Sequence, residues 1–180
     1  MLQERMADRI RVRSMRGIFS SLVILYAVAA AGPAFAQATV MGQHRDWGTY
    51  SYQTNSGKAC YVMSVPKQKE PASLNHGDIF FFVSQKPGQA GSLEPQFKTG
   101  YDMQEGSKSI ITIGGRSFSM FTQGSSAWLE NPADEAQILA AMRAGSDMQI
   151  SATSGRGNKT GYTFSLLGLS AALTEMQNCR

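Results

Sequence analysis

The residues of this sequence that could do chemistry are few and widely spaced. Ser64 and Lys67 match the Ser-x-x-Lys pattern of penicillin-binding enzymes, and Lys159-Thr160-Gly161 matches a second element of that set. This chemistry needs the serine at the start of a helix and the lysine one turn later. Pro66 instead marks the exit from a strand-like segment, and the companion Ser-Asp-Asn is missing. We therefore expect a protein that is not an enzyme, with no catalytic residues.

The two histidines, His44 and His76, do not make a metal or catalytic set. A zinc site uses three or four His or Cys ligands. A histidine-based triad would need a nucleophile, and the sequence has no Gly-x-Ser-x-Gly turn. A phosphate-binding loop needs glycine before its lysine, where this chain has Asn158 before Lys159. We expect no metal and no cofactor.

The two cysteines, Cys60 and Cys179, are predicted to form a structural disulfide. Two cysteines in an exported protein most often pair. Closing a loop of about 120 residues would remove roughly 4–5 kcal/mol of unfolded-state entropy. A redox-active pair is the alternative, but the Cys-x-x-Cys spacing typical of such pairs is absent. Two free thiols are the remaining alternative.

A few residues are candidates for contact with a partner. Two lysines lie in a polar segment after Pro66, and two basic residues lie in the Ser/Gly-rich stretch 154–161, which is typical of an exposed hairpin loop. Tryptophan is enriched in interaction hot spots, although core packing is the commoner role and is favoured here for both Trp128 and Trp47. The candidates are Lys67, Lys69, Trp128, Arg156 and Lys159.

Residues 1–36 have the features of a secretory signal peptide. Arginines precede an apolar run, Leu22–Ala31, and an Ala-x-Ala site ends at Ala36, after which we expect cleavage. Translation could start at Met1 or at Met15. The run is too short for an ordinary transmembrane span, although an uncleaved helix is the alternative. The protein is therefore expected to be periplasmic or secreted.

The charge of the mature chain is nearly balanced. Five of the 17 basic and two of the 13 acidic residues lie in residues 1–36, which leaves 12 basic and 11 acidic residues. This balance gives no support for a nucleic-acid partner. Residues 37–45 are small and polar and predict a flexible lead-in, and residues 46–180 are expected to form a single domain without a further transmembrane segment.

The elements that would position these residues are clearest between Ser109 and Gly145. Strand-like alternation on both sides of Gly114-Gly115 predicts a tight hairpin. Asn131 as an N-cap and Pro132 as the first helical residue predict a capped helix over about 132–144, with Gly145 as its stop.

Strand patterns recur along the rest of the chain, and residues 78–84 are the most apolar, which predicts a central strand covered on both faces. Residues 170–178 predict a short C-terminal helix. About eight short strands and two helices favour a mainly β fold, an antiparallel sandwich or a partly open barrel. The other predicted strands are 46–52, 59–65, 96–103, 148–153 and 162–167.

Several segments together resemble the invasion-associated locus B (IalB) family of alphaproteobacterial envelope proteins. The resemblance covers almost all of the mature chain and implies a secreted or periplasmic protein without established catalytic activity, linked in some relatives to entry into host cells. The matching segments are DWGTY (46–50), ACYVMSVPKQKEP (59–71), DIFFFVSQKP (78–87), residues 114–146, SGRG (154–157) and YTFSLLGLSAAL (162–173).

Two functional hypotheses follow. The leading one is an exported, non-enzymatic cell-envelope protein that acts through contacts with an unknown envelope or host protein, with a part in host-cell invasion as the resemblance implies. The alternative is a periplasmic small-molecule binding or carrier domain that uses an apolar interior near Phe80, Phe82 and Trp128. Neither hypothesis specifies an oligomeric state.

Overall fold

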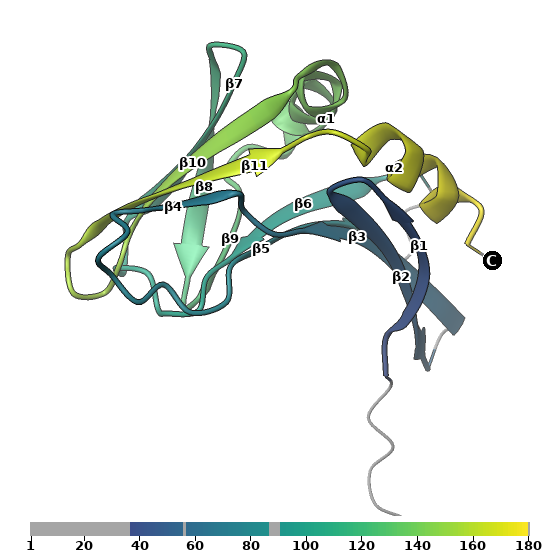
Figure 1. The fold of residues 1–180 in the computed structure, drawn as a ribbon. Coiled ribbons are helices and arrows are strands. Elements are labelled where there is room, and N and C mark those ends of the chain that lie inside the picture. The colour runs from purple at the N-terminus through teal and green to yellow at the C-terminus, as the bar shows by residue number, and fades with distance from the viewer. Residues whose placement is uncertain (1–36, 56, 87–90, 180) are drawn as a thin grey trace, which may run out of the picture. The chain divides into compact units, whose positions relative to one another are not determined.

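The structure is a computed structural model that describes residues 37–55, 57–86 and 91–179. Within these residues, eleven strands form one antiparallel sheet in the order β1-β2-β3-β5-β6-β9-β8-β7-β10-β11-β4 (Figure 1). The expected mainly β, open antiparallel fold with two helices is confirmed, although the strands exceed eight. The strands are β1 (Thr39–His44), β2 (Trp47–Thr54), β3 (Gly57–Ser64), β4 (Gln68–Glu70), β5 (Phe80–Gln85), β6 (Leu93–Lys98), β7 (Lys108–Ile113), β8 (Arg116–Gln123), β9 (Ser126–Leu129), β10 (Asp147–Thr153) and β11 (Lys159–Ser165).

The sheet bends so that the inner faces of its two halves pack on each other. One half runs from β1 to β9 in the sheet order and the other from β8 to β4. Phe81 of β5 and Phe97 of β6 both contact Phe164 of β11, with ring centroids 6.0 and 6.4 Å apart, although these strands are far apart in the order. All three rings are fully buried. The core therefore lies between the halves.

The predicted Gly-Gly hairpin is present. Strands β7 and β8 pair up to Ile113 and Arg116. Between these residues, Gly114 and Gly115 have φ values of 53° and 80°. Two consecutive positive φ angles are what a type I′ turn requires, and glycine adopts them without steric cost. The two glycines thus set the register of the hairpin.

The predicted helix cap is also present. The Asn131 side chain accepts a hydrogen bond from the Ala133 backbone N–H at 3.1 Å, at the start of a short 3₁₀ turn (Pro132–Asp134). This turn leads directly into α1 (Glu135–Ala144), which buries Ile138 and Met142.

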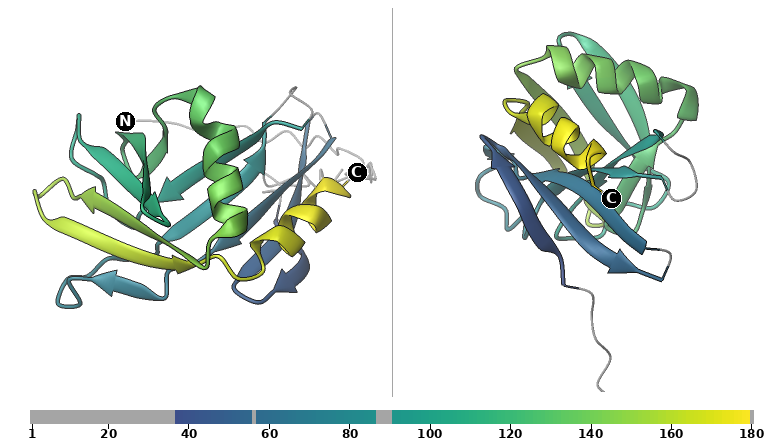
Figure 2. Two further views of the ribbon diagram at one scale, coloured as in Figure 1. Left: turned by 90° about the horizontal axis from the view of Figure 1, so that it is seen from above. Right: turned by 90° about the vertical axis from the view of Figure 1, so that its right-hand side faces the viewer.

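The second helix, α2 (Leu169–Gln177), follows β11 and packs on β1, β2 and β3. Figure 2 shows both helices on the same side of β2 and β3. The buried face of α2 carries Leu169, Ala172, Leu173 and Met176.

Three short strands were not predicted. The expectation of a flexible lead-in over residues 37–45 is wrong, because β1 pairs with β2 and His44 contacts Glu175 of α2 at 2.8 Å. Strand β4 lies in the expected polar loop and pairs with β11, and β9 follows β8. The expected strand over 96–103 is instead β6, which ends at Lys98. These strands are specified by their partners rather than by their own composition.

The expected signal peptide, with its cleavage site after Ala36, lies outside the described residues. In the described part of the chain, no helix is both long enough and apolar enough to cross a membrane.

The structure joins Cys60 and Cys179 in a disulfide. Their Cα atoms are 6.3 Å apart, and the bond closes a sequence separation of 119 residues. Cys60 is a buried residue of β3, and Cys179 follows α2 after one residue. The bond therefore holds the end of α2 against the first half of the sheet.

Removal of the disulfide by the double substitution Cys60→Ala and Cys179→Ala is expected to lower the free energy of unfolding by about 2–5 kcal/mol, because the long unfolded loop is no longer constrained. Urea unfolding of the oxidised wild type and the double variant measures the difference. The reduced wild type should match the double variant. Equal stability of the oxidised and reduced wild type would contradict the prediction.

Gly145 ends α1 as predicted, but for a reason other than backbone conformation. Its φ is −83°, which any residue can adopt. A Cβ at this position would lie 2.9 Å from Ile113 Cγ2 and 3.0 Å from Leu166 Cδ1. Glycine is thus needed because the helix end sits tightly against the core.

The substitution Gly145→Ala is expected to destabilise the protein by about 1–3 kcal/mol through overpacking. Gly161→Ala is the matched control, because a Cβ there would lie 3.9 Å from its nearest neighbour, Glu70 Cβ. Urea unfolding of both variants tests the difference. A Gly145→Ala variant as stable as Gly161→Ala would show that the helix end moves aside freely.

Candidate contact surface

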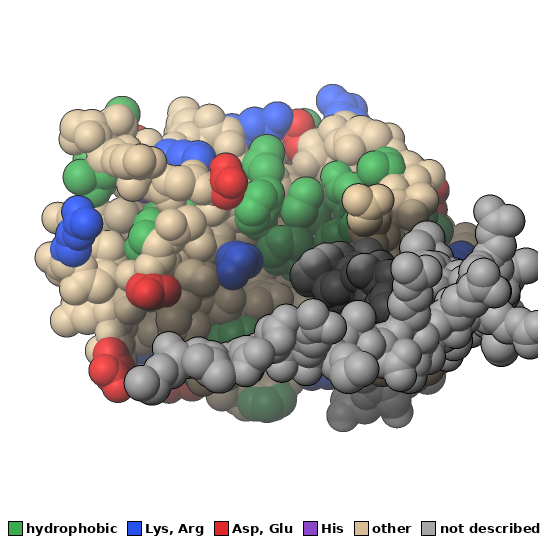
Figure 3. All heavy atoms as spheres, turned by 90° about the horizontal axis from the view of Figure 1, so that it is seen from below, with side chains coloured by type: hydrophobic (Ala, Val, Ile, Leu, Met, Phe, Trp, Pro, Cys, Tyr) green, Lys and Arg blue, Asp and Glu red, His purple; other side chains and the backbone are tan. Residues whose placement is uncertain are grey.

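Seven aromatic side chains lie on the outward face of the sheet between β2 and β8 in the sheet order, that is, on the first half and the adjoining strand β8. In the view from below, hydrophobic side chains gather near the middle of the visible face, and charged side chains lie beside them as well as at the edges (Figure 3). We call these seven the aromatic face: Tyr50 and Tyr52 of β2, Tyr61 of β3, Phe80 and Phe82 of β5, Phe121 of β8 and Trp128 of β9.

The alternation of strand side chains places these residues outward. In β5, Phe81 and Val83 are fully buried, whereas Phe80 and Phe82 are only half-buried. Successive strand residues point to opposite faces, so Phe80 and Phe82 share the side away from the core. The expectation that residues 78–84 are covered on both faces is therefore wrong. Within the aromatic face, Tyr52 and Phe121 are the most open, at 39% and 44% exposed.

The rings contact one another across neighbouring strands. Tyr61 stacks on Tyr50 with ring centroids 5.3 Å apart and lies 5.8 Å from Phe82. Phe121 and Trp128 form a second stack at 5.7 Å. Burial by its neighbours raises the pKa of the Tyr61 hydroxyl, and the nearby Tyr50 and Tyr52 raise it further. The rings therefore form two packed clusters rather than isolated exposed side chains.

Strand register brings the two clusters into one row. Phe82 pairs with Gln96, Gln96 with Trp128, and Trp128 with Phe121. On the other side, Phe82 pairs with Met63 of β3. Five neighbouring strands about 4.8 Å apart make a row of roughly 20 Å. Only Gln96 interrupts the apolar side chains of this row.

Beyond β8, the sheet presents a different outward face. There the outward positions of β7, β10 and β11 include Thr112, Gln149, Ser151 and Thr163, and Ile110 of β7 is the apolar exception. These strands share the same core as the first half, so the fold does not require aromatic residues outside. The aromatic face is thus confined to the strands from β2 to β8 in the sheet order.

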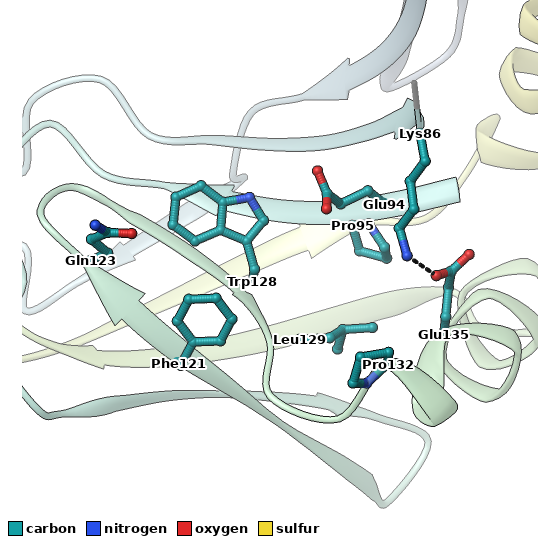
Figure 4. A pocket seen from close by; sticks show the side chains of 9 residues that line it. All are labelled: Lys86, Glu94, Pro95, Phe121, Gln123, Trp128, Leu129, Pro132 and Glu135. Atoms are coloured by element: carbon teal, nitrogen blue, oxygen red, sulfur yellow. Dashed lines mark hydrogen bonds and ion pairs between the residues drawn. The ribbon is translucent and has the colours of Figure 1, made fainter. Parts of the chain in front are cut away.

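A hollow of about 360 Å³ lies beside the second ring stack (Figure 4). Trp128 and Phe121 line one end, and the ion pair of Lys86 with Glu135 lines the other, with Leu129 between them. A second hollow, of about 370 Å³, lies over the first cluster and is lined by Tyr52, Tyr61, Phe82, Ser84, Gln96 and Lys98. Each ring cluster thus adjoins a recess that can receive a side chain.

Glu135 holds the wall of the first hollow in place. Its carboxylate accepts hydrogen bonds from Lys86 Nζ at 2.5 Å, Leu93 N at 2.9 Å and Ser92 Oγ at 3.0 Å. Burial by itself raises the pKa of Glu135, but these three hydrogen bonds and the charge of Lys86 bring the pKa below the ordinary value. The start of α1 is thereby attached to the connection between β5 and β6.

The structure does not bring the sequence-predicted contact residues together. Lys67 pairs with Asp46, and Lys69 of β4 donates to the Gly77 carbonyl at 2.8 Å. Arg156 lies in the β10–β11 loop, and Lys159 donates to Thr153 Oγ1 at 2.9 Å. Of the five candidates, only Trp128 belongs to the aromatic face.

The tyrosines of β2 and β3 and Phe121 were not predicted to be surface residues. Alternation in Tyr50-Ser51-Tyr52 showed that the two tyrosines share a face, but not which face. The apolar interior expected near Phe80, Phe82 and Trp128 is not an interior, because all three lie on the outward side.

The serine–lysine pattern does not have enzyme geometry. Ser64 ends β3, and its hydroxyl donates to the Asp46 carbonyl at 2.7 Å. The described residues contain no group of three or more His, Cys, Asp or Glu side chains that could hold a metal ion.

Comparison with known structures identifies the class of fold. The crystal structure of invasion associated protein B from Bartonella henselae matches with a TM-score of 0.58 and 12% sequence identity, covering 78% of this chain and 95% of that chain. At this identity the match shows a shared fold.

The sequence itself matches the family described as Invasion associated locus B (IalB) protein over residues 47–177. The chain therefore belongs to the IalB family, and the resemblance seen in the sequence is confirmed. A comparison with curated proteins gives no match.

The pKa of Glu135 leads to a pH-dependent prediction. Because folding lowers this pKa, the carboxylate stabilises the fold above its unfolded pKa, and this stabilisation is lost as the pH falls through the folded value. Glu135→Gln should therefore be less stable than the wild type by about 1 kcal/mol at neutral pH, and the difference should vanish in acid. Urea unfolding at neutral and acidic pH measures it.

Glu130→Gln is the control, because Glu130 pairs with Lys108 at the exposed surface and such pairs contribute little. A Glu135→Gln variant with the same deficit at both pH values would contradict the electrostatic explanation.

Proposed function

We propose that this protein is exported and acts without catalysis, by holding a partner protein on the aromatic face. The observation that carries the proposal is the contrast between the two outward faces of one sheet, aromatic on β2, β3 and β5 and, apart from Ile110, polar on β7, β10 and β11. Contiguous exposed apolar patches on soluble proteins mark interaction sites. Such a surface is costly to keep in water unless it binds something.

Three features support export. The first 36 residues have the composition of a secretory leader. Cys60 and Cys179 are joined, and such bonds persist mainly in oxidising compartments. The chain belongs to a family named for invasion.

The chemistry of the aromatic face favours a protein partner. Tyr, Trp and Phe are enriched in the cores of protein interfaces, where their large rings bury much area at a low cost in side-chain entropy. The hollows beside Trp128 and Tyr61 offer recesses for apolar side chains of the partner. Such anchors in recesses are typical of binding hot spots.

The place in the cell where these contacts form is part of the same proposal. A similar structure is titled invasion associated protein B of Bartonella henselae. We extend to this chain a contact role at the cell surface, with a component of its own envelope or with a host protein, and host-cell invasion is the specific setting that the family name suggests.

Site-specific photo-cross-linking in intact cells tests the proposal. A photoreactive phenylalanine analogue placed at Phe121 or at Tyr52 should cross-link to the same partner, because both positions border the aromatic face. The analogue at Ser117, an exposed residue of β8 beyond the face, is the matched control and should not. Mass spectrometry identifies the partner.

Binding of the purified partner then gives the quantitative result. Truncation of an interface hot spot costs at least about 2 kcal/mol, so the double variant Tyr52→Ser and Phe121→Ser should weaken binding by about thirtyfold. The variant Ser117→Ala should bind as the wild type does. A partner that binds the double variant with unchanged affinity, or a cross-link formed only from Ser117, would overturn the proposal.

A further inference from the structure

A third hollow lies away from the aromatic face, where three loops meet. Residues 74–76 follow β4, residues 101–102 follow β6, and residues 154–158 connect β10 to β11. Together these segments line a hollow of about 460 Å³, which we call the loop hollow. Its volume falls within the range of about 300–1,000 Å³ found for small-molecule sites.

The floor of the loop hollow is a chain of hydrogen-bonded side chains. His76 Nε2 faces the Pro71 carbonyl at 2.9 Å, and Nδ1 faces the Tyr162 hydroxyl at 2.9 Å. Tyr162 in turn contacts the Tyr101 hydroxyl at 2.8 Å, and Tyr101 contacts Thr160 Oγ1 at 2.7 Å. Burial, and then the hydrogen bond with Tyr101, raises the pKa of Tyr162, so its hydroxyl stays neutral. These polar groups satisfy one another and form a pre-ordered floor.

The direction of the two His76 hydrogen bonds follows from the carbonyl end. A carbonyl can only accept, so His76 Nε2 donates to Pro71. In the tautomer protonated on Nε2, Nδ1 accepts from the Tyr162 hydroxyl. Either hydroxyl can donate in the bonds that Tyr101 makes with Tyr162 and Thr160, and Thr160 Oγ1 can also donate to the Ala152 carbonyl at 3.3 Å. These groups are therefore engaged with one another or with the backbone, and a ligand in the loop hollow meets unpaired charged groups only on the rim.

The rim carries two residues of opposite charge, Asp102 and Arg156, on loop segments whose backbones are hydrogen-bonded to each other. Gly155 N donates to the Asp102 carbonyl at 2.8 Å, and Met103 forms a β-bridge with Ser154. Arg156 is the exposed residue next to Gly155, and Asp102 is also exposed. Among the described residues, neither the Arg156 guanidinium nor the Asp102 carboxylate has an ion-pair or hydrogen-bond partner.

We propose that the loop hollow binds a small zwitterion, such as an amino acid or a dipeptide. The Arg156 guanidinium suits a carboxylate, to which it can donate two parallel hydrogen bonds. Asp102 suits the ammonium group. The half-buried Tyr101 and Leu74 supply apolar contacts for the body of the ligand, and the Asn158 amide adds a donor and an acceptor at the rim.

The pair of charges favours a zwitterion over a simple ion. A free anion would be attracted by Arg156 but repelled by Asp102. A free cation would be attracted by Asp102 but repelled by Arg156. Only a ligand with both charges gains from both residues. This site does not involve the aromatic face and is independent of the partner proposed for it.

Nuclear magnetic resonance titration of the purified, ¹⁵N-labelled exported protein tests the proposal. The probes are L-alanine, L-glutamine and glycylglycine, with acetate and ethylamine as single-charge comparisons. At least one zwitterion should give saturable amide shifts at Asp102, Gly155 and Arg156, and should bind about tenfold more tightly than acetate or ethylamine, since it makes one more charge-assisted hydrogen bond.

Three variants complete the test. Arg156→Gln and Asp102→Asn should each weaken zwitterion binding about tenfold, while Lys159→Gln, which removes a neighbouring charge outside the loop hollow, should leave it unchanged. All three positions are exposed, so unaltered spectra elsewhere should confirm folding. The proposal is overturned if no zwitterion gives saturable shifts, if either rim variant binds as the wild type does, or if acetate binds as tightly as the zwitterions.

Discussion

Trp47 links the two halves of the bent sheet on the side away from the β9–β8 junction, where the start of β2 lies against the end of β11. The indole is fully buried, its ring meets Phe81 edge-on with centroids 6.4 Å apart, and Nε1 donates to the Ser165 carbonyl at 2.9 Å. A buried indole N–H needs an acceptor, and here the acceptor is the carbonyl of the last residue of β11. Trp47 begins β2, so the bond fixes the start of β2 against the end of β11. Because the indole is buried, the alternation along β2 turns Tyr50 and Tyr52 outward. Helix α2 begins four residues after Ser165, so the same contact places α2 beside β2.

Local signals in the sequence predicted the parts of the fold that local interactions determine. The Gly114-Gly115 hairpin and the Asn131 cap are present because a positive φ angle and a capping oxygen act within a few residues. Strand β1 was missed because Gly42 and the polar residues after it interrupt its strand-forming residues, and β4 was missed because it is only three polar residues long. They exist because β2 and β11 offer unpaired edges, and β1 is further held by the contact of His44 with Glu175. Such pairing is a property of the folded chain.

The candidate sites were harder to predict, for a definable reason. Period-two alternation separates the inner from the outer face only when the outer residues are polar. In β5 both sets are aromatic, so the sequence could not show that Phe82 lies outside while Phe81 lies inside. The loop hollow has no sequence signal either, since Asp102 and Arg156 are 54 positions apart and are brought together by the bond from Gly155 to Asp102. The number of residues between two positions does not show whether the fold brings them close together.

The outward rings also stabilise the sheet, and this role has to be separated from binding. A cross-strand aromatic pair contributes roughly 0.2–1 kcal/mol, which accounts for the stacked Tyr50 and Tyr61 at the centre of their cluster. It accounts less well for Tyr52 and Phe121, whose exposed fractions of 39% and 44% leave much ring surface in water. Polar residues serve at outward positions elsewhere in the sheet, such as Gln149 and Ser151 of β10. Stability therefore explains the inner rings of the aromatic face, and the open rings at its margins are the ones for which binding is the better physical reason.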